Sequence, residues 1–153
     1  MDFGQDIQSY LRKKEEQYDT TDCLTAHDIS PIVRARMVDW IIEVLTNFQL
    51  SDQTFFTSVQ LMDRYFKASP HRLPVTKLHI IGVTSMFVAS KYEDVCPLRM
   101  QTVDEKISQG KIPKAQIKQQ EADMLSALRY QVHSPTIVDF LSHFLYEVLG
   151  IEV

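Results

Sequence analysis

The side chains that most often carry out chemistry are spaced in this sequence in ways that no common reaction or metal site uses. Cys23 and Cys96 stand far apart, and neither belongs to a Cys-x-x-Cys pattern or a Cys/His pattern of metal ligands. No glycine-rich phosphate loop, His-Glu-x-x-His pattern or nucleophile motif occurs. The sequence therefore predicts a protein that is not an enzyme, that needs no metal or cofactor, and whose cysteines are free thiols in a reducing compartment.

Two charged residues lie on helix faces that are otherwise apolar. At about 100° per residue, Arg34 projects into the arc that Ile41 and Leu45 define on one predicted helix. On the next helix Asp63 lies beside the apolar stripe, whereas Arg64 points to the opposite side. A buried guanidinium needs a partner, so we predict a largely buried Arg34–Asp63 pair whose loss unfolds the domain. The alternative is that both charges reach the rim and are solvated.

A second pair of charges interrupts two apolar helices further along the chain. Lys91 follows an uncharged run at residues 78–90, and Glu121 lies between Ile117 and Leu125 on its helical wheel. If the two helix ends adjoin, the ammonium group of Lys91 can reach the carboxylate of Glu121. Such a pair either serves a partner or consists of ordinary rim charges.

The elements that must position these side chains are helices. Apolar residues recur at intervals of three and four, and alternating runs are nearly absent, so the predicted fold class is all-α. Ser30 followed by Pro31 is a strong helix start. The helix predicted at residues 75–92 has no polar face and is the expected hub of the bundle. The predicted helices span residues 6–17, 31–48, 52–68, 75–92, 100–108 and 114–128, and a last one runs from 134 to just before 150.

Composition restricts the size of the protein and the kind of partner. A chain of 153 residues with 44% hydrophobic content suits one domain. The formal charge is -4 and the longest basic run is residues 12–14, so no nucleic-acid partner is expected. The uncharged run at residues 78–90 is shorter than the roughly 20 residues that cross a bilayer, so no membrane partner is expected either. A protein partner is favoured.

Several motifs together resemble the N-terminal box of cyclins, in order along residues 6–136. Residues 6–12 (Asp-Ile-Gln-Ser-Tyr-Leu-Arg) look like the helix that precedes the box in A- and B-type cyclins. Residues 33–41 (Val-Arg-Ala-Arg-Met-Val-Asp-Trp-Ile) are similar to the family's Met-Arg-Ala-Ile-Leu-Val-Asp-Trp-Leu, and residues 62–66 to its Ile-Asp-Arg-Phe-Leu. Residues 89–94 (Ala-Ser-Lys-Tyr-Glu-Asp) resemble the end of its third helix. The mitotic cyclins are the nearest group.

The resemblance also implies a domain organisation. A single five-helix cyclin box is expected at residues 31–133, after an N-terminal helix and linker at 1–30 and before one extra C-terminal helix at 134–153. Typical members carry a second five-helix repeat, and the extra helix would be its first. We expect this helix to fold back on the box or to pair with another chain, because it carries an apolar stripe of Ile137, Phe140, Leu141, Phe144 and Val148.

By the same resemblance, the partner is a cyclin-dependent protein kinase. Lys91 and Glu121 are then expected to contact the kinase near its mobile regulatory helix, and Arg34 with Asp63 to hold the box together. The apolar part of the kinase contact is implied at Val88, Tyr92, Leu125, Tyr130 and Val132, with a second patch at Ile7 and Tyr10.

The family's docking groove for substrate or inhibitor peptides is implied at Val33, Arg36, Met37, Trp40, Glu43 and His79. Arg36 replaces an apolar residue of the family pattern and His79 replaces a glutamine. A cationic Arg36 repels the arginine of an Arg-x-Leu peptide while Glu43 attracts it, so altered specificity and lost docking are both open. Trp40 is alternatively packed under a loop.

The function implied is that of a regulatory subunit that binds and activates a cyclin-dependent kinase in the cell cycle, at mitosis, in nucleus and cytoplasm. The chemistry would belong to the kinase, whose Lys–Glu pair is completed when its regulatory helix is held inward. The alternative is a cyclin-box adaptor in transcription that activates no kinase. Such adaptors normally present a basic face, which the net acidity of this chain argues against.

Overall fold

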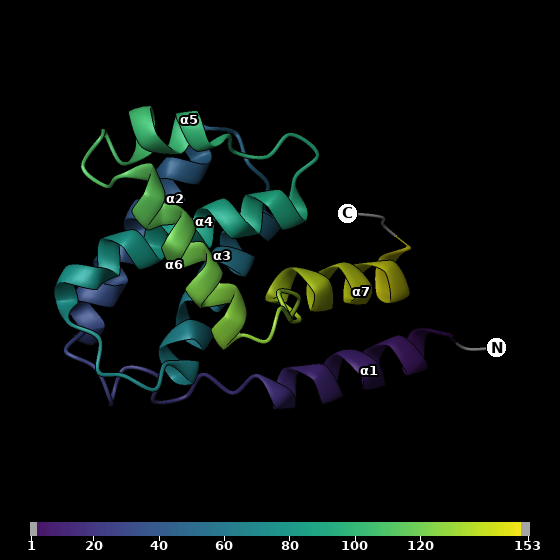
Figure 1. Cartoon of the computed structure of the whole chain (residues 1–153). Helices are drawn as coiled ribbons and strands as arrows, with labels where there is room; N and C mark the ends of the chain where they lie inside the picture. The colour runs from purple at the N-terminus through teal and green to yellow at the C-terminus, as the bar shows by residue number, and fades with distance from the viewer. Residues whose placement is uncertain (1–2, 151–153) are drawn as a thin grey trace.

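The computed structural model describes residues 3–150, and every regular element in that range is a helix (Figure 1). This confirms the predicted all-α class. A single isolated bridge joins Asp28 to Pro74 within the described residues. The helices are α1 Phe3–Gln17, α2 Pro31–Asn47, α3 Asp52–Ala68, the 3-10 turn η1 Val75–Lys77, α4 Leu78–Glu93, α5 Met100–Thr102, the π-helical turn η2 Val103–Ile107, α6 Lys114–Ala127 and α7 Ile137–Leu149.

Side-chain caps set the starts of α2 and α3 where the sequence predicts them. The hydroxyl of Ser30 accepts a hydrogen bond from the backbone N–H of Val33 at 3.3 Å, and Pro31 occupies the first helical position. Ser51 accepts in the same way from the N–H of Thr54 at 3.2 Å. Both helices therefore begin where free amide groups have a nearby oxygen.

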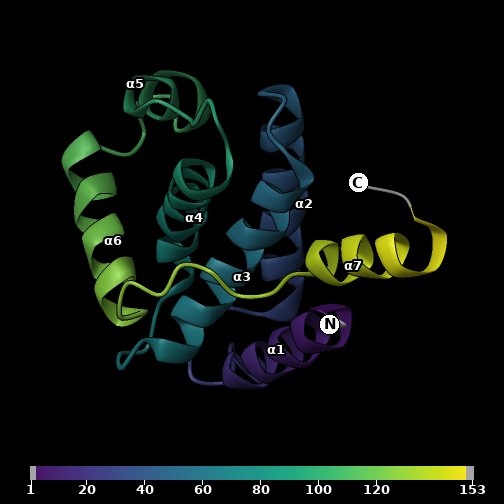
Figure 2. The ribbon, with the colours of Figure 1, turned by 90° about the vertical axis from the view of Figure 1, so that its right-hand side faces the viewer.

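Helix α4 is the hub of the bundle, as predicted, and α2, α3 and α6 surround it (Figure 2). Every residue from Leu78 to Ser90 is buried except His79, which is half-buried. Gly82 allows α2 to approach closely, because a Cβ atom at this position would lie 2.5 Å from the Sδ atom of Met37. A helix without a polar face thus has neighbours on nearly all sides.

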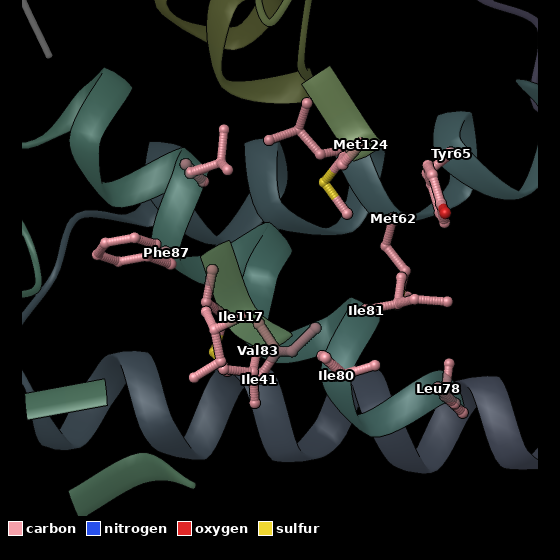
Figure 3. Packing of buried hydrophobic residues seen from close by; sticks show 14 of the residues in the cluster. Ile41, Met62, Tyr65, Leu78, Ile80, Ile81, Val83, Phe87, Ile117 and Met124 are labelled. Carbon is pink, nitrogen blue, oxygen red and sulfur yellow. The ribbon is translucent and has the colours of Figure 1, made fainter. Parts of the chain in front are cut away.

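The core lies where α2, α3, α4 and α6 meet (Figure 3). Residues that the sequence placed on the inner arcs of four helices are almost completely buried there, so the periodic pattern identified the inner faces correctly. These residues include Ile41 of α2, Met62 and Phe66 of α3, Ile81 and Met86 of α4, and Ile117 and Met124 of α6.

Two element boundaries differ from the prediction. The helix expected at residues 100–108 is one turn of α5 followed by the π-helical η2. The last helix begins at Ile137 rather than at Ser134 and Pro135, because those residues already have partners. The hydroxyl of Ser134 donates to Gln60, whose side-chain amide donates to the carbonyl of Pro135 at 2.6 Å. Helix α7 is instead started by a capping box between Thr136 and Asp139.

Helix α7 folds back beside α1 and reaches α3, but most of its apolar side chains are not covered (Figures 1 and 2). The side-chain amide of Gln53 on α3 donates to Asp139 at 3.3 Å and links the two helices. No residue of α7 is buried, and Phe140 alone of the predicted stripe is half-buried. The exposed remainder consists of Ile137, Leu141, Phe144 and Val148, together with Tyr146 and Leu149.

Candidate functional site

The charged pair predicted from the helical wheels of α2 and α3 is present. Arg34 donates from Nε to Oδ1 of Asp63 at 2.7 Å and from Nη2 to Oδ2 at 2.5 Å. Bonding to this carboxylate raises the pKa of Arg34. Asp63 is buried as predicted, and Arg34 is half-buried, with 29% of its side chain exposed. Residues 20–25 leave a hollow of about 550 Å³ that admits solvent to the guanidinium.

Cys23 lies beside this ion pair, with its Sγ atom 3.9 Å from Oδ1 of Asp63. Burial, reinforced by the negative charge of Asp63, raises the pKa of the Cys23 thiol to about 11. Cys96, by contrast, is exposed, and both cysteines are free. The two thiols therefore differ in environment and should differ in reactivity.

The second predicted pair is also formed. The ammonium group of Lys91, at the end of α4, donates to Oε1 of Glu121, in the middle of α6. The same ammonium lies 4.2 Å from the centre of the Phe87 ring. Both side chains remain partly accessible to solvent, so the pair lies at the molecular surface and not in the core.

An open hollow of about 330 Å³, lined in part by Tyr92, which follows Lys91 in the sequence, gathers aromatic side chains from three parts of the chain. Tyr92 of α4 stacks against His133, with 6.3 Å between ring centres. Tyr130 is 72% exposed, and α1 contributes Tyr10 from the opposite wall. We call this the aromatic hollow, and it is lined by Tyr10, Lys14, Tyr18, Tyr92, Tyr130, Gln131, Val132 and His133.

Four of the residues implied for a kinase contact thus come together, since Tyr10, Tyr92, Tyr130 and Val132 all line the aromatic hollow. Leu125 is half-buried on α6, and Ile7 is exposed on α1. Val88 differs from the expectation, because it is only 4% exposed and belongs to the core of α4. Its side chain is therefore not part of the surface that a kinase could contact.

The residues implied for peptide docking lie along the outer side of α2 and at the start of α4. The ring of Trp40 meets that of His79 edge to face, with 5.1 Å between centres, and both residues are half-buried. Arg36 and Glu43 are exposed. The pKa of His79 is lowered mainly by burial and to a smaller extent by the positive charge of Lys111. Val33 is half-buried on the same side, whereas the half-buried side chain of Met37 reaches Gly82 of α4.

The sequence reasoning missed Arg64. Its side chain does point away from Asp63 as the wheel indicated, but that side of α3 is also buried, by residues 131 and 132. Arg64 donates to the backbone carbonyls of Val132 at 3.0 Å and of Gln131 at 2.5 Å. Backbone carbonyls leave no signature in a sequence, so no pattern could have identified these partners.

Between residues 3 and 150, no group of three or more His, Cys, Asp or Glu side chains is arranged to hold a metal ion. Within the same range, no helix is both long and apolar enough to cross a bilayer.

The fold is that of an all-helical domain that presents ion-paired and aromatic side chains on its surface, which is typical of a protein-binding module. Residues 6–133 match the cyclin N-terminal domain. That match covers most of the chain, and the chain belongs to the cyclin family.

The similar proteins are A- and B-type cyclins. The G2/mitotic-specific cyclin-B of Marthasterias glacialis is 33% identical over 141 residues, and that of Arbacia punctulata is 36% identical over 143 residues. Cyclin-A3-4 of Arabidopsis thaliana is 32% identical over 148 residues. These matches cover 92%, 92% and 93% of this chain, but only 36%, 34% and 39% of the relatives. The chain spans about a third of the length of these relatives.

Proposed function

We propose that this chain binds and activates a cyclin-dependent protein kinase in the control of mitosis. Membership of the cyclin family, whose members are regulatory subunits rather than enzymes, and similarity to cyclins named mitotic-specific support this proposal. The observation that carries it is the Lys91–Glu121 pair at the molecular surface, whose lysine immediately precedes Tyr92, a residue that lines the aromatic hollow. Exposed tyrosines are among the anchors that protein interfaces favour.

The roles of the residues follow from their chemistry. The ammonium of Lys91 and the carboxylate of Glu121 are already oriented by each other, so they can bond to a kinase helix with little loss of side-chain entropy. Tyr92, Tyr130 and Tyr10 offer apolar area with a polar tip. Binding at this surface would hold the kinase's regulatory helix inward and complete the Lys–Glu pair that positions its ATP.

The experiment mixes the chain with a monomeric mitotic-type cyclin-dependent kinase and follows complex formation and histone phosphorylation together. The test variant is Lys91→Ala/Glu121→Ala. The control is Lys114→Ala/Asp104→Ala, which removes another surface lysine–carboxylate pair. Nζ of Lys114, at the start of α6, lies 3.3 Å from Oδ2 of Asp104. We expect the parent and the control to activate the kinase and the test variant to lose both binding and activation.

Other outcomes separate the competing functions. Binding without phosphorylation would show that this segment docks on a kinase but does not activate it, which contradicts the activating half of the proposal. A parent chain that binds no kinase would favour a cyclin-box adaptor in transcription.

Three finer proposals accompany the main one. The outer side of α2 together with His79 is a docking surface for substrate or inhibitor peptides. Arg36 alters the peptide specificity of this surface relative to that of the family. Its test compares the binding of Arg-x-Leu peptides to the parent and to Arg36→Ile, and stronger binding to the variant is expected because the repelling charge is removed.

We also propose that α7 pairs with a second copy of the chain, and that the protein occurs in nucleus and cytoplasm.

A further inference from the structure

Arg64 is a buried cation without an acidic partner. The residue is 6% exposed, and within residues 3–150 no carboxylate lies within salt-bridge distance of it. Burial lowers the pKa of its guanidinium, which means that the protein environment opposes the charge. Placing a charge there costs free energy unless its hydrogen bonds are used, so the partners of Arg64 indicate what the cation does.

Those partners are Tyr18, Gln131 and Val132, which all line the aromatic hollow. Two N–H groups of the Arg64 fork reach the carbonyls of Gln131 and Val132, just after α6. The guanidinium carbon lies 4.1 Å from the centre of the Tyr18 ring, just after α1. The hydroxyl of Tyr18 then donates to Oε1 of Gln131 at 2.8 Å, which closes a ring of contacts among three segments.

The segment that Arg64 holds is conformationally unfavourable without support. Arg129 and Tyr130 both have left-handed backbones, with φ of 52° and 59°. Each such non-glycine residue costs roughly 1–2 kcal/mol, so two in succession need contacts that hold them. The bonds from Arg64 act on the next two residues, and Tyr130 is thereby presented to the aromatic hollow.

We propose that Arg64 is a positioning residue for kinase binding, because it fastens residues 129–133 and the end of α1 to α3 and so assembles the aromatic hollow. The inference rests on the proposed function of that hollow. A lysine cannot replace it, since one ammonium cannot present a planar fork to two carbonyls and a flat face to a tyrosine ring.

The first test compares Arg64→Lys with Arg72→Lys in the intact chain. Arg72 is an exposed arginine that bonds to Asp28 and does not line the aromatic hollow, so this variant controls for the substitution itself. We expect kinase affinity to fall about tenfold for Arg64→Lys and to stay unchanged for the control. Parent-like affinity of Arg64→Lys would overturn the proposal.

A double-mutant cycle with Tyr130→Ala distinguishes positioning from general destabilisation. If Arg64 acts through Tyr130, adding Arg64→Lys to Tyr130→Ala weakens binding no further. Additive losses would contradict the proposal. Should Arg64→Lys fail to fold, Tyr18→Leu removes the stacked ring and the bond to Gln131 from the protein surface, and it takes the same place in the cycle with the same expectation.

NMR of the free protein separates this inference from the proposed function. Nuclear Overhauser contacts between the Tyr18 and Gln131 side chains should be present in the parent and in Arg72→Lys and lost in Arg64→Lys. If these contacts behave so but the parent binds no kinase, the proposed function fails and the assembling role of Arg64 stands. Contacts that persist in Arg64→Lys would overturn that role.

Discussion

At the scale of single residues, the Arg34–Asp63 pair is asymmetric. The side chain of Asp63 is 11% exposed and that of Arg34 is 29% exposed, although both residues line the hollow beside residues 20–25. Removal of the arginine therefore leaves a buried carboxylate without its partner, while removal of the aspartate leaves a guanidinium that can turn toward water. The cost of breaking a buried ion pair depends on which charge stays behind.

Arg34→Ala should consequently destabilise the domain by about 3–5 kcal/mol, and Asp63→Ala by a smaller amount, about 1–3 kcal/mol. Urea denaturation followed by circular dichroism measures both. The control is Arg72→Ala, which removes an arginine from the exposed pair with Asp28 and should leave the unfolding midpoint unchanged. Equal losses for the two test variants would show that the difference in exposure has no energetic consequence.

The two cysteines should react at very different rates. Cys96 is exposed, whereas Cys23 is buried and its thiol pKa is raised to about 11, so almost none of it is thiolate near neutral pH. Iodoacetamide at pH 8 should modify Cys96 in the native protein and Cys23 only after denaturant is added, as peptide mass spectrometry can show. Rapid native labelling of Cys23 would contradict the packing of residues 20–25.

At the scale of the elements, α7 combines a strong start with an uncovered face. Its capping box fixes the first turn, and Gly150 ends it with a left-handed backbone at φ 63°. Between these caps most of the apolar stripe faces solvent. A patch of this kind usually marks an interface, and α1 beside it adds the exposed side chain of Phe3.

We therefore expect the chain to self-associate through α7 in a concentration-dependent manner. The double variant Leu141→Glu/Phe144→Glu should be monomeric by analytical ultracentrifugation, because charges would enter the apolar contact. Ile32→Glu, which changes an exposed apolar residue on α2, is the control and should behave as the parent does. A parent that stays monomeric at all concentrations would contradict this expectation.

Helix periodicity predicted the Arg34–Asp63 pair, because both charges interrupt a regular apolar pattern, and it gave Lys91–Glu121 only on the condition that two helix ends adjoin. It could not reveal which other chain segments cover a helix. The resemblance to cyclins placed Val88 at the kinase contact, but Val88 packs in the core, as expected of a helix without a polar face. Helix α7 begins later than predicted because Ser134 donates a hydrogen bond to Gln60. Arg64 donates to backbone carbonyls of residues far along the chain. The differences at α7 and Arg64 arise from tertiary contacts.

At the scale of the whole molecule, the proposed binding face is assembled from both ends of the sequence. Helix α1 supplies Tyr10, the end of α4 supplies Lys91 and Tyr92, and α6 with the following residues supplies Glu121 and Tyr130. The outer side of α2 and the apolar face of α7 belong to other surfaces. One kinase domain bound at the aromatic hollow would therefore leave peptide docking and self-association free to occur elsewhere.

Hydrogen exchange of the chain with and without the kinase shows where the kinase binds, because it reports which backbone segments the partner protects. We expect slower exchange at residues 91–94 and 129–133, and unchanged exchange along the outer side of α2. The Lys114→Ala/Asp104→Ala control should give the same protection, and Lys91→Ala/Glu121→Ala should give none. Protection confined to α2 or α7, with residues 129–133 unaffected, would contradict the account.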